Sequence, residues 1–90
     1  MRILAIDPGN EQSAYCLIDA GSMRPLQFDK TDNAAVRAAL GQREQYDRVV
    51  IEMIGHYGTG MPAGKSVFDT CVWIGRFMET VERLGLSADL

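Results

Sequence analysis

Three short apolar runs separated by turns open the chain. Residues 2–7 contain an apolar run at positions 3–6 that ends at Asp7, which predicts a central strand covered on both faces. Residues 13–19 predict a second strand, and residues 25–30 predict a third, which Pro25 favours at the edge of a sheet. Because the connections are short, we expect an antiparallel meander.

The period of the pattern changes after the third run. Residues 31–33 offer N-cap side chains, and residues 34–40 have high helix propensity. The predicted helix ends at Gly41 or one turn later at Glu44. Residues 48–54 then predict a fourth strand, with one acidic residue inside an otherwise apolar run.

A long helix closes the pattern. Residues 66–84 have helical spacing, and Gly85 is placed to cap the helix. The apolar stripe is wide, which indicates either a second packing surface, such as a dimer partner, or a deeply buried helix in a small core. The central stripe comprises Val67, Cys71, Ile74, Met78 and Val81, and it is widened by Trp73, Phe77, Leu84 and Phe68. The order βββαβα predicts a single α/β domain over residues 1–90, ending before a fifth strand.

Charge and cysteine content narrow the function classes. The 12 acidic residues outnumber the 9 basic residues, giving a net charge of −3. This argues against a free-standing nucleic-acid clamp, but not against an enzyme that meets DNA through metal ions held by carboxylates. The apolar runs are too short for a membrane span. Cys16 and Cys71 are expected to be buried thiols in a reducing cytoplasm.

Two acidic residues stand out by their positions. Asp7 ends the first strand, and Glu52 lies within the apolar run of residues 49–54. A carboxylate among apolar strand residues is costly unless it is hydrogen-bonded, paired or bound to a cation. A single acid at a strand end is more often an N-cap or turn acceptor, whereas the pair favours a functional site. If the two strands are parallel neighbours, both carboxylates lie at the same sheet edge and can hold a divalent metal. We therefore predict Asp7 and Glu52 as catalytic metal ligands.

The motifs around these acids resemble a known family. Ile-Asp-Pro-Gly at residues 6–9, the apolar strand at 14–19 and Val-Val-Ile-Glu at 49–52 are similar to RuvC-type Holliday junction resolvases of phages and bacteria. Ala14 stands where the family usually has glycine. The resemblance implies an RNase H-like fold with a mixed sheet in the order 3-2-1-4-5. It also implies a Mg²⁺- or Mn²⁺-dependent endonuclease (a hydrolase) of branched DNA, active in DNA recombination and repair.

The resemblance assigns roles to the two acids and leaves part of the site unmatched. Asp7 would bridge two metal ions, and Glu52 would bind one of them. The family's remaining ligands, a His/Asp-x-x-Asp arrangement after the fifth strand, have no match, because Asp89 lacks a partner. The chain therefore resembles the N-terminal part of such a domain, ending at Leu90, and is expected to be inactive alone.

A glycine-rich loop follows the fourth strand. Residues 55–65 resemble a phosphate-binding P-loop, but the spacing to Gly-Lys-Ser is wrong from either glycine, and Pro62 removes an amide donor. In the resolvase interpretation this loop borders the active site. His56, Tyr57 and Lys65 are then candidate DNA contacts through stacking and phosphate binding; the alternative for each is a solvated loop residue.

Two other functions remain open. A nucleotide-binding domain of the actin and sugar-kinase type shares the topology, and a nucleotide-induced melting shift would favour it. The second alternative is a non-catalytic module retained for dimerisation. Tight self-association with weak metal binding would favour it. In the resolvase interpretation we also expect a homodimer, formed through the 66–84 helix and an exposed strand at residues 48–54.

Overall fold

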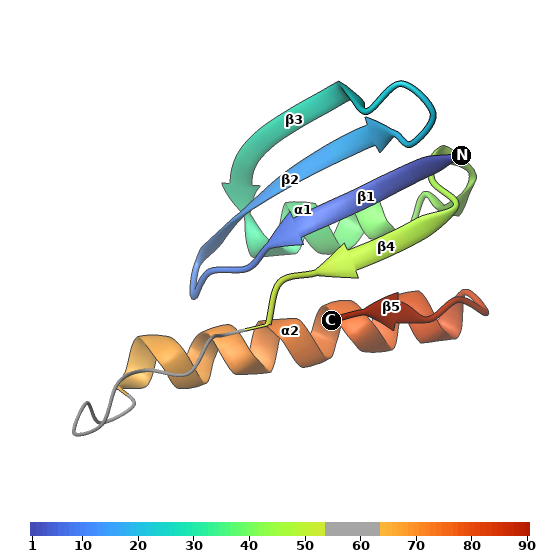
Figure 1. The fold of residues 1–90 in the computed structure, drawn as a ribbon. Helices are drawn as coiled ribbons and strands as arrows, with labels where there is room; N and C mark the ends of the chain where they lie inside the picture. Colours follow the sequence, from blue (N-terminus) through green and yellow to red (C-terminus); the bar gives the residue numbers. More distant parts are fainter. Residues whose placement is uncertain (54–63) are drawn as a thin grey trace.

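A mixed sheet with two helices makes up the computed structural model, which describes residues 1–53 and 64–90 (Figure 1). The sheet has five strands in the order β3-β2-β1-β4-β5. Strand β1 pairs antiparallel with β2 and parallel with β4, so its predicted central position is confirmed. The elements are β1 (Arg2–Asp7), β2 (Gln12–Asp19), β3 (Arg24–Asp32), α1 (Asn33–Leu40), a 3-10 turn (Arg43–Gln45), β4 (Arg48–Ile51), α2 (Lys65–Arg83) and β5 (Ala88–Asp89).

The fifth strand corrects the expectation that the chain ends before one. Residues 49–50 of β4 pair in parallel with Ala88–Asp89, so part of the β4 edge is covered. The guanidinium of Arg48 donates to the carboxylate of Asp89 at 2.6 Å. Gly85, with a φ of 81°, adopts the left-handed conformation that lets the chain turn back along the sheet directly after α2.

Other boundaries differ from the sequence prediction by a few residues. Strand β3 continues to Asp32, so Asp29 lies inside the strand and not at its end. Strand β4 ends at Ile51, shorter than the predicted 48–54 within the described residues, and Glu52 follows it directly. Helix α1 ends at Leu40, and the following 3-10 turn is a separate element.

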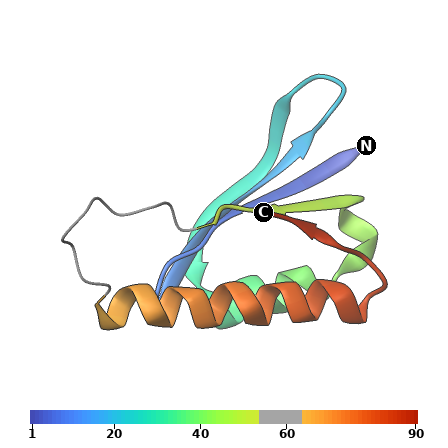
Figure 2. The ribbon, with the colours of Figure 1, turned by 60° about the horizontal axis from the view of Figure 1, so that its bottom comes forward.

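Both helices pack on one face of the sheet (Figure 2). The core lies between the helices and the sheet, and its buried residues are Leu4, Ile6, Leu17, Val36, Leu40, Tyr46, Val49, Ile51, Ile74, Phe77 and Val81. Within residues 1–53 and 64–90, no helix covers the opposite face, so the expected cover on both sides of β1 is not found there. Apolar side chains on this open face include Phe28, which is 72% exposed, and Val50. We call this surface the open sheet face.

Helix α2 buries only part of the predicted stripe, since Ile74 and Val81 are buried as predicted but Cys71 is exposed. Its buried residues are Thr70, Ile74, Phe77 and Val81. Thr70 tolerates burial because its hydroxyl donates to the Ser66 carbonyl at 2.8 Å. Phe68 is 61% exposed, so the alternative of a deeply buried helix is wrong. Cys71 is also exposed, so the prediction that its thiol is buried is wrong. No helix of the described residues is long and apolar enough to cross a membrane.

Candidate metal site

The parallel pairing of β1 and β4 brings Asp7 and Glu52 together. Ile6 lies opposite Ile51 in the register, and the backbone N–H of Glu52 donates to the carbonyl of Ile6 at 2.9 Å. Ile6 and Ile51 both face the core, whereas Asp7 and Glu52, the residues that follow them, line a hollow with Ala5 and Val50 on the open sheet face. The expected placement of the two carboxylates at one edge of the sheet is therefore confirmed.

The two carboxylates line the same hollow and influence each other electrostatically. A side-chain hydrogen bond with Asp7, and then the negative charge of Asp7, raise the pKa of Glu52 above its ordinary value. Both side chains are exposed to solvent. A pair of this kind lowers its repulsion in one of two ways, by retaining a proton or by binding a cation.

The turn after β1 is held by two buried polar residues that the sequence analysis did not single out. The N–H of Gly9 donates to the Ser13 hydroxyl at 3.1 Å, and the side-chain amide of Asn33 donates to the Gly9 carbonyl at 2.9 Å. The Ser13 hydroxyl in turn donates to the side-chain oxygen of Asn33 at 2.5 Å. The available signal was a polar residue at an inward-facing position of β2, in line with Leu17.

Two hollows border this site, one lined by both acids and the other by Asp7 without Glu52. The larger, about 500 Å³, is lined mainly by apolar side chains of β1, β2 and β4, together with Asp7 and Glu52. The smaller, about 250 Å³, is lined by Asp7, Gln12 and Lys30 among others. Lys30, which sequence reasoning missed, is thus a cationic side chain that borders the same hollow as Asp7.

The pair suits a hard divalent cation through its donor type, because carboxylate oxygens are the ligands that Mg²⁺ and Mn²⁺ prefer. Among the described residues, no group of three or more His, Cys, Asp or Glu side chains is placed to hold a metal. Other aspartates are engaged elsewhere: Asp19 accepts from Ser22, and Asp69 pairs with Lys65. Within the described residues, an ion at this site would have Asp7 and Glu52 as its candidate protein ligands.

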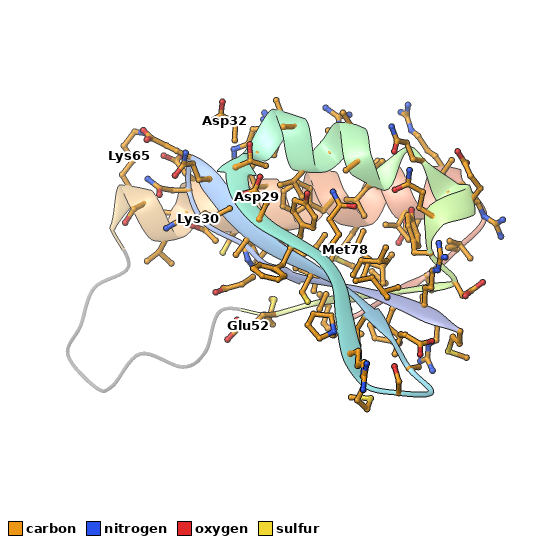
Figure 3. All side chains as sticks on the ribbon, turned by 90° about the horizontal axis from the view of Figure 1, so that it is seen from above. Asp29, Lys30, Asp32, Glu52, Lys65 and Met78 are labelled. Carbon is orange, nitrogen blue, oxygen red and sulfur yellow. The ribbon has the colours of Figure 1, made fainter. Side chains whose placement is uncertain are left out.

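The predicted DNA-contact residues lie partly outside this site. His56 and Tyr57 fall outside the described residues. Lys65 is the first residue of α2, and its ammonium lies 2.6 Å from the carboxylate of Asp69, whose hydrogen bond raises the pKa of Lys65. Figure 3 shows Lys65 well separated from Glu52. A role for these three residues in DNA contact remains a prediction.

Two solved structures share this arrangement of elements. One is "T. thermophilus RuvC in complex with Holliday junction substrate", which is 13% identical over 98% of this chain, with a TM-score of 0.74. The other, a structure of Thermus thermophilus RuvC, is 15% identical over 98% of this chain, with a TM-score of 0.69. The chain has the RuvC-type, RNase H-like fold.

The RuvC-type fold confirms the predicted fold class and the strand order 3-2-1-4-5. The chain spans 62% and 61% of the length of the two RuvC chains. No protein-family model and no curated protein sequence matches it. At this low identity, the likeness to RuvC establishes the fold, and the chemistry has to be argued from the side chains of the site.

Proposed function

We propose that this protein is a divalent-metal-dependent nuclease of branched DNA whose metal ligands are Asp7 and Glu52. The observation that carries the proposal is the placement of these two carboxylates along one hollow, at the ends of paired parallel strands in a RuvC-type fold. Branched DNA is proposed as the substrate because a protein of the same fold, the T. thermophilus RuvC, was solved with a Holliday junction substrate.

The chemistry of the site follows from its charges. A bound Mg²⁺ or Mn²⁺ supplies charge neutralisation at the scissile phosphate and lowers the pKa of a bound water. Asp7 and Glu52 hold the ion, and the hydrogen bond between the Glu52 backbone and Ile6 fixes the strand ends that carry them. Lys30 borders the same hollow as Asp7, where its charge favours a DNA phosphate.

We further propose that this chain alone cleaves DNA poorly. A two-ion site must balance four positive charges, and the pair offers two negative ones. The described residues bring no third carboxylate to the site. Full activity would then require acidic side chains beyond those described, as the family's two-ion site implies.

A metal titration tests the site. Mn²⁺ binding, followed by calorimetry and by paramagnetic broadening of NMR signals, is expected to be weak in the wild type. Asp7→Asn and Glu52→Gln are each expected to weaken it by at least about tenfold, since changes that merely support a ligand already cost 10- to 100-fold. Asp29→Asn, which removes an exposed carboxylate from β3, is the matched control. Equal binding by the wild type and the double variant would place the metal elsewhere.

The substrate is tested separately on a synthetic four-way junction. We expect weak binding at physiological salt, because nine basic residues release few counterions. We also expect little nicking with Mg²⁺ or Mn²⁺. Robust cleavage that disappears in Asp7→Asn would establish the nuclease but contradict the proposed incompleteness of the site.

We also propose that the protein forms a homodimer. Because β5 covers part of the β4 edge, the exposed side of α2 around Phe68 and Val72 is the better candidate for the contact. Tight self-association without any metal binding would favour the non-catalytic module. The nucleotide-binding alternative gains no support from the RuvC-type fold, and a melting shift with nucleotide would revive it.

A further inference from the structure

We infer that Ser13 and Asn33 are positioning residues, which fix the turn after β1 and through it set Asp7 facing Glu52. The inference rests on the proposed metal site, because it concerns how one of the two ligands is held. Neither residue touches the carboxylates, and both act through the backbone of Gly9.

The contacts form a closed circuit around one residue of the turn, Gly9. Ser13 accepts a hydrogen bond from the N–H of Gly9, and Asn33 donates one to the Gly9 carbonyl, so both backbone polar groups of Gly9 are bound. The direct bond between Ser13 and Asn33 completes the circuit. A second bond, from the Asn33 N–H to the Glu11 carbonyl at 2.9 Å, holds the far side of the turn.

Burial makes this circuit costly to disturb. Ser13 and Asn33 are each 1% exposed, and no buried side-chain nitrogen or oxygen of the described residues lacks a partner. A buried donor or acceptor that loses its partner costs about 1–3 kcal/mol. The two side chains therefore resist any movement of Gly9 that would break their bonds.

The circuit limits the freedom of Asp7 because the chain between them is short. The ladder between β1 and β2 ends at the pair Asp7 and Ala14. Pro8, the next residue, has a fixed φ and therefore little backbone freedom. It also has no N–H, so its backbone cannot donate a hydrogen bond to hold the turn. The first residue after Asp7 whose backbone these side chains anchor is Gly9. Its position fixes the direction in which the chain leaves Asp7.

The residue types in the turn fit this task. A side chain at position 9 would place its Cβ 2.2 Å from the Gln12 carbonyl oxygen, so only glycine allows the turn to close this tightly. Asn33 begins α1, and its side chain reaches back to the turn. The metal site is thereby tied to the helix layer as well as to the sheet.

Two conservative variants and one control test the inference. Ser13→Ala removes the hydroxyl, and Asn33→Asp keeps the acceptor for Ser13 while replacing the donor to Gly9. The control is Tyr46→Phe, which removes another buried hydrogen bond, from the Tyr46 hydroxyl to the Leu40 carbonyl, near the opposite end of β4. Unfolding in urea measures stability, ¹⁵N relaxation measures the backbone order of residues 7–11, and paramagnetic broadening measures Mn²⁺ affinity.

We expect both site variants to lose backbone order in residues 7–11 and to bind Mn²⁺ about tenfold more weakly, as supporting residues of metal sites do. Tyr46→Phe should lower stability without changing either readout. Unchanged order and affinity in a folded Ser13→Ala would overturn the inference, and so would an equal loss in Tyr46→Phe. If the wild type binds no Mn²⁺, the proposed function fails, yet the backbone order still decides whether Ser13 and Asn33 fix the turn.

Discussion

At the scale of single residues, the fold holds two like charges side by side on an exposed edge. Asp7 raises the pKa of Glu52 above its ordinary value. At a pH between the ordinary and the raised value, the folded protein therefore retains a proton that the unfolded chain releases. Stability from this pair is therefore greatest below the ordinary pKa of 4.5 and is lost as the pH rises through the raised value. The site is thus less stable when both groups are ionised and no cation is present.

Glu52→Gln should therefore stabilise the metal-free protein near neutral pH while weakening metal binding. The substitution removes the repulsion with Asp7, so we expect a modestly higher urea midpoint than in the wild type. The difference should disappear below pH 4.5, where the wild-type Glu52 is protonated. Urea titrations at the two pH values, with Glu44→Gln as an exposed control, provide the measurement. A neutral-pH midpoint below that of the wild type would contradict the proposed repulsion.

Two glycine substitutions should have opposite effects. Gly9→Ala forces a Cβ to within 2.2 Å of the Gln12 carbonyl, and such overpacking costs about 1–3 kcal/mol. Gly75 is exposed within α2 and has nothing within 4 Å of the new Cβ, so Gly75→Ala should add about 0.5–1 kcal/mol. Thermal or urea unfolding of both variants checks the prediction. Equal effects in the two would mean that the turn relaxes to accept a side chain.

At the scale of elements, α2 carries two phenylalanines in opposite surroundings. Phe77 is fully buried in the core, whereas Phe68 is 61% exposed. Phe77→Ala should cost about 3–5 kcal/mol, and Phe68→Ala less than about 0.5 kcal/mol. Urea unfolding at low protein concentration separates the two. A large cost for Phe68→Ala would mean that α2 lies deeper than the described burial indicates.

The elements that carry the acids were predictable from the sequence for a physical reason. Asp7 and Glu52 are charged residues at the ends of apolar runs, and the helical segment between the two strands allows them to be parallel neighbours. The fifth strand was missed because two residues show no periodicity. The α2 stripe was misplaced because apolar residues lie on several flanks, and a hydroxyl that bonds its own helix, as in Thr70, packs like an apolar group.

The positioning residues were missed for a different reason. Ser13 and Asn33 are ordinary polar residues in sequence, and their importance arises only when three segments of the chain meet at Gly9. Hydrogen bonds between residues far apart in the chain leave no periodic signal. The placement of the two acids was therefore predictable, but the contacts that hold the turn after Asp7 were not.

At the scale of the whole molecule, the helices occupy one side and leave apolar surface elsewhere. Phe28 lies on the open sheet face, and Phe68 and Val72 lie on the exposed side of α2. Contiguous exposed apolar surface commonly marks an interaction site. Because the exposed apolar residues lie on two separate sides of the molecule, substitutions on each side can show which side forms the contact between copies of the chain.

Self-association should be detectable and should depend on α2. We expect a dimer or larger species in sedimentation at high micromolar concentration, because the exposed apolar residues of α2 gain by burial. Phe68→Ser should shift the distribution toward the monomer, and Phe28→Ser should leave it unchanged. A clean monomer for the wild type would remove the dimer, and the reverse order of the two variants would move the contact to the open sheet face.

The parallel pairing of β1 with β4 also links the acids to the folding equilibrium. Asp7 and Glu52 are separated in the sequence by β2, β3 and α1, and only the folded pairing of β1 with β4 brings them together. The unfolded chain therefore presents no pair for a divalent ion. A ligand that recognises only the native state stabilises it by mass action, by about 2.7 kcal/mol at a hundredfold excess over its dissociation constant. Free divalent cation would then act as a folding ligand, and its concentration would govern how much of the chain survives proteolysis as well as how much is ready to react.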